Sequence, residues 1–159
     1  MTGKLVKRGL IVLQDYSVPV LMRSRIEQVM RKEFSVVPAD AEVKSVVQHF
    51  SPEGTGALPV VTEDGRLSGI IEPHDLLRGL EDDKRVSEVA RQNYVLAYVG
   101  DTVDQVTRRM LRNDAEHVIV LDRDGATKPI GIVRAADILR LRRWVMEEEE
   151  EAHPVKPGK

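Results

Sequence analysis

A pattern of nine residues that occurs twice limits the fold of this chain more than any other feature. The copies occupy residues 69–77 and 131–139. Each has a glycine, two β-branched apolar residues, a charged residue, two variable residues, an aspartate and two apolar residues. The glycine admits close approach of another backbone, and the β-branched pair suits a buried strand. We therefore expect a strand that turns into a helix in each copy, with Asp75 and Asp137 in the first helical turn.

The two aspartates allow two interpretations. A carboxylate beside free helix amides, at the carboxyl end of a strand, can hold a ribose or another hydroxyl-rich ligand. Alternatively, Asp75 and Asp137 only satisfy the N-termini of their own helices. Because the aspartate takes the same position in both copies, the pattern favours a ligand site without excluding the helix-capping role.

The repetition extends beyond this pattern to most of the chain. Val43 and Val46 lie 60 positions before Val103 and Val106, and the Asp-Gly pair at 64–65 recurs at 124–125. Two additional residues within 126–130 then change the spacing to 62. Such a register across strands, turns and helices indicates an internal duplication. We predict an approach segment (1–23), a first repeat (24–82), a second repeat (83–146) and an acidic, disordered tail (147–159).

Each repeat is predicted to contain a short strand, a helix, a strand, a tight turn, a strand and a second helix. In the first repeat we expect strands over 34–37, 58–62 and 67–71 and helices over 41–50 and from Pro73 onward, with inward-facing Val43, Val46, Val47, Phe50, Leu76, Leu77 and Leu80. A unit of about 60 residues buries little surface alone. We therefore expect an α/β (α+β) fold in which two β-α-β-β-α units pack through their sheets about a pseudo-twofold axis and leave two clefts.

Composition excludes several classes of protein. The net charge of -2 gives no electrostatic basis for binding nucleic acid. The absence of cysteine excludes disulfides and thiolate metal sites. No apolar run approaches the roughly 20 residues that cross a bilayer, and charged residues interrupt the N-terminal apolar stretch. We expect a cytoplasmic protein, or the cytosolic part of a membrane protein.

The sequence shows no arrangement typical of catalysis or metal binding. The four histidines, His49, His74, His117 and His153, lie on unrelated predicted elements without ligand spacing, so we expect solvated or cleft-lining side chains. No nucleophile has a neighbouring base and an orienting third group. We predict no catalytic residue, no metal site and no enzymatic activity.

With these features the chain resembles a tandem pair of CBS (cystathionine β-synthase) domains, the arrangement called a Bateman module. The resemblance covers about residues 24–146. It rests on the duplicated pattern, on the lead-in segments at 26–30 and 86–90, and on the strands near 58–61 and 117–120. It implies a regulatory module that forms disc-like homodimers and binds an adenosine nucleotide (AMP, ADP or ATP) or a related ligand between the repeats.

The resemblance also implies which residues contact the ligand. Asp75 and Asp137 would hold ribose hydroxyls. His117 precedes a predicted strand and would line a cleft, either as a ligand contact or as packing. Strand residues would enclose the base, namely Val36, Pro59, Tyr94, Val95, Leu96 and Val118.

This chain departs from the family pattern at one position in each repeat. Nucleotide-binding members usually carry Thr or Ser three residues before the aspartate, and this chain has Glu72 and Arg134 there. A phosphate is repelled by a carboxylate and attracted by a guanidinium. We therefore expect the cleft of Asp137 and Arg134 to be the better anion site, and the cleft of Asp75 and Glu72 to be empty or to hold an uncharged ligand.

The approach segment is similar to one subfamily. Residues 4–9 and Tyr16, ahead of residues 23–30, are similar to the link between the last membrane helix and the CBS pair of CLC-type chloride channels and transporters. This similarity implies an attached membrane transport domain.

The leading hypothesis is a ligand-sensing CBS pair, and the alternative is a ligand-free dimerisation module, such as the cytosolic domain of a chloride channel or another membrane transporter.

Overall fold

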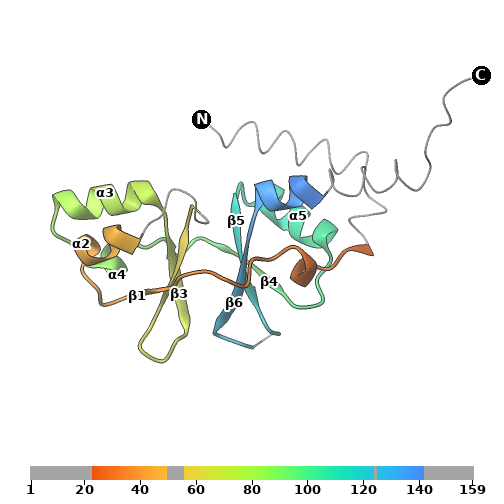
Figure 1. Cartoon of the computed structure of the whole chain (residues 1–159), viewed down its shortest axis with the longest axis horizontal. Helices are drawn as coiled ribbons and strands as arrows, with labels where there is room; N and C mark the ends of the chain where they lie inside the picture. Colours follow the sequence, from red (N-terminus) through yellow and green to blue (C-terminus); the bar gives the residue numbers. More distant parts are fainter. Residues whose placement is uncertain (1–22, 50–55, 124, 142–159) are drawn as a thin grey trace, which may run out of the picture.

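Two three-stranded sheets lie side by side in the centre of the molecule, and helices cover their outer sides (Figure 1). The computed structural model describes residues 23–49, 56–123 and 125–141. The first sheet contains β1 (Val37–Pro38), β2 (Leu58–Val61) and β3 (Leu67–Ile71), and the second contains β4 (Val95–Tyr98), β5 (His117–Leu121) and β6 (Pro129–Arg134). The helices are η1 (Ile26–Gln28), α2 (Val43–Val46), η2 (Val47–His49), α3 (Pro73–Glu81), α4 (Val86–Val89), α5 (Val103–Arg112) and a helix over 135–141.

The two sheets have the same topology. In each sheet the middle strand is parallel to the first strand and antiparallel to the third. The turns of the two hairpins contain Gly65 and Gly125, with φ angles of 82° and 87°, a region that favours glycine. The predicted fold class and the two predicted hairpins are therefore confirmed.

The repeats pack through their sheets, as predicted. Residues of both repeats form one shared buried cluster: Ala57, Ile70, Ile119, Leu121 and Ile132. Phe34 and Tyr94, which take equivalent positions in the two repeats, pack against this cluster. Because burial of one aliphatic side chain contributes about 1.5–3 kcal/mol, this shared cluster couples the stability of the two repeats.

Each lead-in segment, taken from here on to extend over residues 26–32 and 86–92, packs on the opposite repeat. Ile26 is buried among residues of the second repeat, and its backbone N–H donates to the carbonyl of Asp101 at 2.8 Å. Val86 is buried in the core of the first repeat, and its N–H donates to the carbonyl of Ala41 at 2.9 Å. In Figure 1 the orange chain runs from the second repeat past β6 to β1. The exchange interlocks the two repeats.

The glycine of each duplicated pattern lies where a lead-in segment crosses the sheet. A Cβ at Gly69 would lie 3.0 Å from the carbonyl oxygen of Arg91, and a Cβ at Gly131 would lie 2.5 Å from the sulfur of Met30. Next to these glycines, Ile70 pairs with Arg91 and Ile132 with Arg31. The predicted close approach of another backbone is therefore confirmed at Gly69, whereas at Gly131 the close neighbour is the Met30 side chain.

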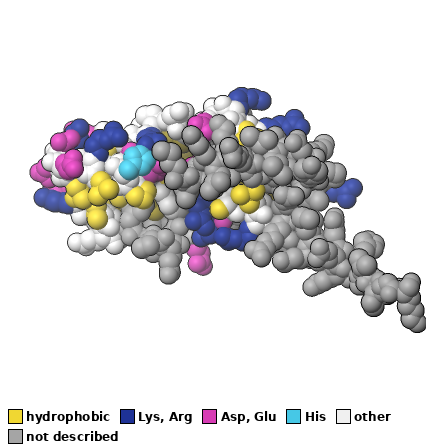
Figure 2. All heavy atoms as spheres, turned by 90° about the horizontal axis from the view of Figure 1, so that it is seen from above, with side chains coloured by type: hydrophobic (Ala, Val, Ile, Leu, Met, Phe, Trp, Pro, Cys, Tyr) yellow, Lys and Arg dark blue, Asp and Glu magenta, His cyan; other side chains and the backbone are white. Residues whose placement is uncertain are grey.

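The structure corrects the predicted inner face of α3. Leu76 is buried as predicted, but Leu77 is 65% exposed and Leu80 is also exposed. Helix α2 packs directly on Gly79, where a Cβ would lie 2.7 Å from Val43. The contact at Gly79 fixes the inner face of the helix, so Leu77 faces outward. Figure 2 shows hydrophobic side chains at the surface on the side of the molecule where α2 and α3 lie.

Two further element predictions were wrong in extent. The strand expected over 34–37 is shorter and begins later, as β1. The chain just before it instead lies against the second sheet, where Arg31 pairs with Ile132. The helix expected over 41–50 consists of α2 followed by η2, and Val47 is exposed, although it was expected to face inward.

Several predictions concern residues outside the described ranges. These are the approach segment over 1–22, Phe50, the end of the last helix and the acidic tail. Among the residues that the structure describes, no helix is both long and apolar enough to cross a membrane.

Candidate ligand clefts

The two aspartates of the duplicated pattern occupy equivalent, buried positions. Asp75 lies in the first turn of α3, and Asp137 lies in the first turn of the helix over 135–141. In each aspartate Oδ2 accepts the backbone N–H three residues earlier, from Glu72 and from Arg134, at 3.0 Å in both cases. The helix-capping interpretation is therefore correct for one carboxylate oxygen.

The second oxygen of Asp137 lies among three guanidinium groups. Arg31 donates to Oδ1 at 3.4 Å. Arg134 lies 3.6 Å and Arg140 lies 3.9 Å from the same oxygen. This carboxylate therefore lies within a cationic environment built from the lead-in segment, the end of β6 and the last described helix.

The second oxygen of Asp75 has a different environment. Nε of Arg91 donates to Oδ1 at 3.2 Å, and Arg91 is the equivalent of Arg31. His74 Nε2 lies 3.3 Å from the same oxygen. The side chain of Glu72 lies nearby, with Oε2 3.6 Å from His74 Nδ1. The two aspartates thus share an arginine partner and a cap but differ in all other charged neighbours.

A large hollow adjoins Asp137, and we call it the Asp137 cleft. It has a volume of about 970 Å³ and is lined by Ser24, Gln28, Val29, Met30, Arg31, Lys32, Glu33, Asp137, Arg140 and Leu141. Its lining contains three basic side chains and two carboxylates, and Arg134 lies beside it. The field in this cleft favours an anionic ligand.

A smaller hollow adjoins the first repeat's aspartate, and we call it the Glu72 cleft. It has a volume of about 250 Å³ and is lined by Ile70, Glu72, Arg91, Asn93, Tyr94, Val95, Asn113, Asp114, Ala115, Glu116 and His117. Its lining contains three carboxylates and one guanidinium. Burial raises the pKa of the Tyr94 phenol above 10.0, because desolvation disfavours the phenolate. This cleft disfavours an anionic ligand.

The predicted site residues divide between and around these clefts. Asp137 lines its own cleft with Arg134 beside it, whereas Tyr94, Val95 and His117 line the Glu72 cleft. The other predicted base contacts do not line either of these two hollows: Val36 is exposed, Pro59 and Val118 are buried in β2 and β5, and Leu96 is half-buried in β4.

Sequence reasoning missed the basic side chains of the lead-in segment and last helix. Arg31, Lys32 and Arg140 line the Asp137 cleft, and Arg91 lines the Glu72 cleft. One signal was present in the sequence, because Arg31 and Arg91 are separated by the repeat spacing of 60.

Comparison with known sequences gives one family for both halves of the chain. The sequence profile of the CBS domain matches residues 26–82 and again residues 86–143. The uncharacterised protein MJ0188 of Methanocaldococcus jannaschii is 29% identical over 121 residues, which are 75% of this chain and 44% of that protein. Inosine-5'-monophosphate dehydrogenase of Aquifex aeolicus is 23% identical over 164 residues, covering 97% of this chain and 33% of the enzyme. The chain therefore spans less than half the length of these relatives.

Solved structures show the same fold. An uncharacterised conserved protein from Pyrococcus horikoshii aligns with a TM-score of 0.69 and 25% identity, covering 84% of this chain and 61% of that chain. The CBS domain pair of protein MJ0100, solved in complex with 5'-methylthioadenosine and S-adenosyl-L-methionine, aligns with a TM-score of 0.64 and 25% identity, covering 77% of this chain and 98% of that chain.

Proposed function

This chain belongs to the CBS domain family as a tandem pair, and we propose that it is a regulatory module that binds an adenosine-containing ligand in the Asp137 cleft. In this proposal the module is not an enzyme, and ligand binding changes the state of a partner or an attached domain. The module can bias that partner only by the difference in ligand affinity between two arrangements of the repeats.

The observation that carries this proposal is the size and charge of the Asp137 cleft. A volume of about 970 Å³ suits a nucleotide, because small-molecule sites typically measure about 300–1,000 Å³. The Glu72 cleft, at about 250 Å³, lies below that range. Size and charge therefore favour the same cleft.

The side chains of the Asp137 cleft suit the two polar parts of a nucleotide. The Oδ1 atom of Asp137 is a carboxylate acceptor for ribose hydroxyl donors, while Oδ2 remains occupied by the helix cap. Arg31 now pairs with Oδ1, and a ribose at this oxygen would release that guanidinium to a phosphate. An anion 4 Å from one cation gains about 4 kcal/mol at an effective dielectric of 20, before desolvation.

The complex of the MJ0100 domain pair supports the class of ligand. That protein binds two ligands that contain adenosine, and it matches the present chain over 98% of its own length. We extend the class, and not the individual compounds, to this chain. The three arginines near Asp137 favour ligands with phosphates, so we expect affinity to rise from AMP to ADP to ATP.

Isothermal titration calorimetry on the full chain tests this function. AMP, ADP, ATP, 5'-methylthioadenosine and S-adenosyl-L-methionine would be titrated into the wild type, Asp137→Asn and the matched control Asp75→Asn. Asparagine keeps the shape and an acceptor for the helix cap, so both variants should fold. We expect nucleotide heats to be lost in Asp137→Asn and retained in Asp75→Asn. Equal heats in the wild type and Asp137→Asn would refute the assignment of the cleft.

A thermal shift assay separates this proposal from the ligand-free alternative. A ligand at 100 times its dissociation constant stabilises the folded protein by about 2.7 kcal/mol. No shift with any of the five compounds, together with a homodimer in sedimentation, would instead support a dimerisation module.

Homodimer formation, a cytosolic location and attachment to a chloride channel or another transport domain remain predictions. Sedimentation tests the first, and the full-length reading frame tests the last.

A further inference from the structure

We propose that Glu72, His74 and Asp75, joined by His117, form a binding site for a divalent transition-metal ion of the Zn²⁺ class. This proposal is independent of nucleotide binding, because it concerns the Glu72 cleft and α3 rather than the Asp137 cleft. The site combines imidazole and carboxylate donors from both repeats.

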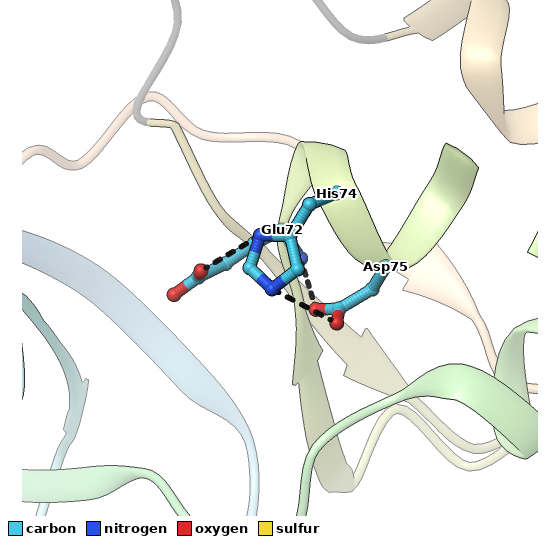
Figure 3. Close-up of side chains that lie close together, drawn as sticks. All are labelled: Glu72, His74 and Asp75. Atoms are coloured by element: carbon cyan, nitrogen blue, oxygen red, sulfur yellow. Dashed lines mark hydrogen bonds and ion pairs between the residues drawn. The ribbon is translucent and has the colours of Figure 1, made fainter. Parts of the chain in front are cut away.

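Three of the donors converge at the start of α3. Figure 3 shows the imidazole of His74 lying between the carboxylates of Glu72 and Asp75. One ligand atom from each of these residues lies within 4.8 Å of the ligand atoms of the other two. The ring of His74 lies 3.6 Å from Glu72 Oε2 and 3.3 Å from Asp75 Oδ1. The first contact is made by Nδ1 and the second by Nε2, so the ring must turn for one nitrogen to face both carboxylates. Metal–ligand bonds of about 2.0–2.2 Å place neighbouring tetrahedral donors about 3.3–3.6 Å apart, so a bound ion would draw these three ligand atoms closer than the observed limit of 4.8 Å.

The fourth donor comes from the other repeat and contacts the other oxygen of Glu72. It lies outside the group of three, so rotation of the Glu72 and His117 side chains must bring it to the ion. His117 begins β5, and its Nδ1 lies 3.7 Å from Glu72 Oε1. The carboxylate of Glu72 therefore lies within 4 Å of an imidazole on each side. A metal ion held by these groups would join the first repeat to the second across the Glu72 cleft.

The donor types favour particular metals. Imidazole nitrogen suits Zn²⁺, Ni²⁺ and Cu²⁺, whereas Mg²⁺ and Ca²⁺ prefer sites built from oxygen alone. The N-terminus of α3 carries a partial positive charge and therefore repels a metal ion. The two carboxylates offset this repulsion. The set therefore favours Zn²⁺ over Mg²⁺.

Arg91 now pairs with the carboxylate of Asp75 and would compete with a metal ion. Its guanidinium donates to Asp75 and also contacts Nε2 of His74. The side chain is 44% exposed, and the backbone of Arg91 is fixed by its pairing with Ile70. The guanidinium can therefore turn into solvent without movement of the lead-in segment.

The second repeat provides an internal comparison, because it lacks this donor set. The positions equivalent to Glu72, His74 and His117 are Arg134, Ala136 and Ala57. Of the four donors only the aspartate recurs, as Asp137, where it lies among arginines. The second repeat thus forms the same fold without these three side chains.

Titration of Zn²⁺ and Mg²⁺ into the chelator-treated full chain tests the proposal. We expect one Zn²⁺ per chain, and Zn²⁺ affinity at least tenfold lower in His74→Ala, His117→Ala and Glu72→Gln. His74 is 52% exposed, so its replacement should leave the fold intact. Asp137→Asn and His153→Ala are matched controls that should bind Zn²⁺ like the wild type. Substitution by Co²⁺ should give the visible absorption of a tetrahedral ion with nitrogen ligands.

Arg91→Ala distinguishes a metal site from a structural polar cluster. Removal of the competing guanidinium should raise Zn²⁺ affinity several-fold, whereas a structural role predicts only lower thermal stability. The proposal is overturned if the wild type binds no Zn²⁺ or if His74→Ala and Glu72→Gln bind it as well as the wild type. Tighter binding of Mg²⁺ than of Zn²⁺ would also overturn it.

Discussion

The two clefts of this molecule lie beside equivalent aspartates but have opposite charge. Each aspartate caps its helix and pairs with an arginine from a lead-in segment, Asp75 with Arg91 and Asp137 with Arg31. Around that shared pair, one cleft is large and basic, and the other is small and acidic. The groups that repeat hold the helix and the crossing chain in place. The groups that differ lie in or beside the clefts, so we expect any difference in ligand preference to arise from them.

The largest expected effect concerns the exchange of the lead-in segments. Ile26 is buried in the core of the second repeat, so Ile26→Ala should destabilise the protein by about 2–5 kcal/mol. Hydrogen exchange should show the loss of protection mainly in β4 and α5. Val86→Ala is the matched variant, with a smaller loss of about 2 kcal/mol centred on α2 and β2, because Val86 lies in the first core. Loss of protection near Ile26 alone would contradict the exchange.

The glycines under the crossing chains should respond differently to one added methyl group. At Gly69 the methyl would meet the rigid backbone of Arg91, whereas at Gly131 it would meet the flexible side chain of Met30. Each change to alanine should cost about 1–3 kcal/mol in urea unfolding. Adding Met30→Ala should recover much of the loss in Gly131→Ala, because it removes the atoms that the methyl meets. No comparable partner exists at Gly69, where the nearest atom is a carbonyl oxygen. Absence of recovery would show that the contact at Gly131 is not with Met30.

The charge difference between the clefts can be reversed one position at a time. Arg134→Glu gives the Asp137 cleft the acidic residue of its counterpart. It should weaken ATP binding by about tenfold or more, since one cation near the phosphates becomes an anion. Glu72→Arg is the matched change in the other cleft, and it should leave ATP affinity within about twofold. Calorimetry at two salt concentrations checks both variants. Tighter ATP binding in Glu72→Arg, with no loss in Arg134→Glu, would instead place the nucleotide in the Glu72 cleft.

The sequence predicted the architecture because the duplication repeats its apolar register and its glycines. Gly69 and Gly131 indicated a close approach of another backbone; the structure confirms this at Gly69 and places a side chain, Met30, against Gly131. The sequence did not show which chain approaches. The exchange of Ile26 and Val86 between the cores depends on contacts between segments far apart in the chain. The outward position of Leu77 depends in the same way on the packing of α2 against α3.

The site was predictable only where it repeats. The aspartates and their helix caps follow from local sequence. The convergence of His74 and His117 on Glu72 does not, because their elements are far apart in sequence and meet only when the sheets pack. Linear spacing suggested unrelated histidines for that reason.

The smallest expected effect compares Tyr94 with Phe34, its equivalent in the first repeat. Burial raises the pKa of the Tyr94 phenol, so the folded state favours the protonated form. The stability that this phenol contributes is complete below pH 10.0, the ordinary pKa, and is lost as the pH rises toward the raised value. Tyr94→Phe makes the two positions alike. It should change stability at pH 7 by less than about 0.5 kcal/mol and reduce the alkaline loss of stability. Ultraviolet titration should show one fewer late-ionising tyrosine in the variant. If the two proteins have the same alkaline profile, the phenol of Tyr94 is solvated and the two positions already share one environment.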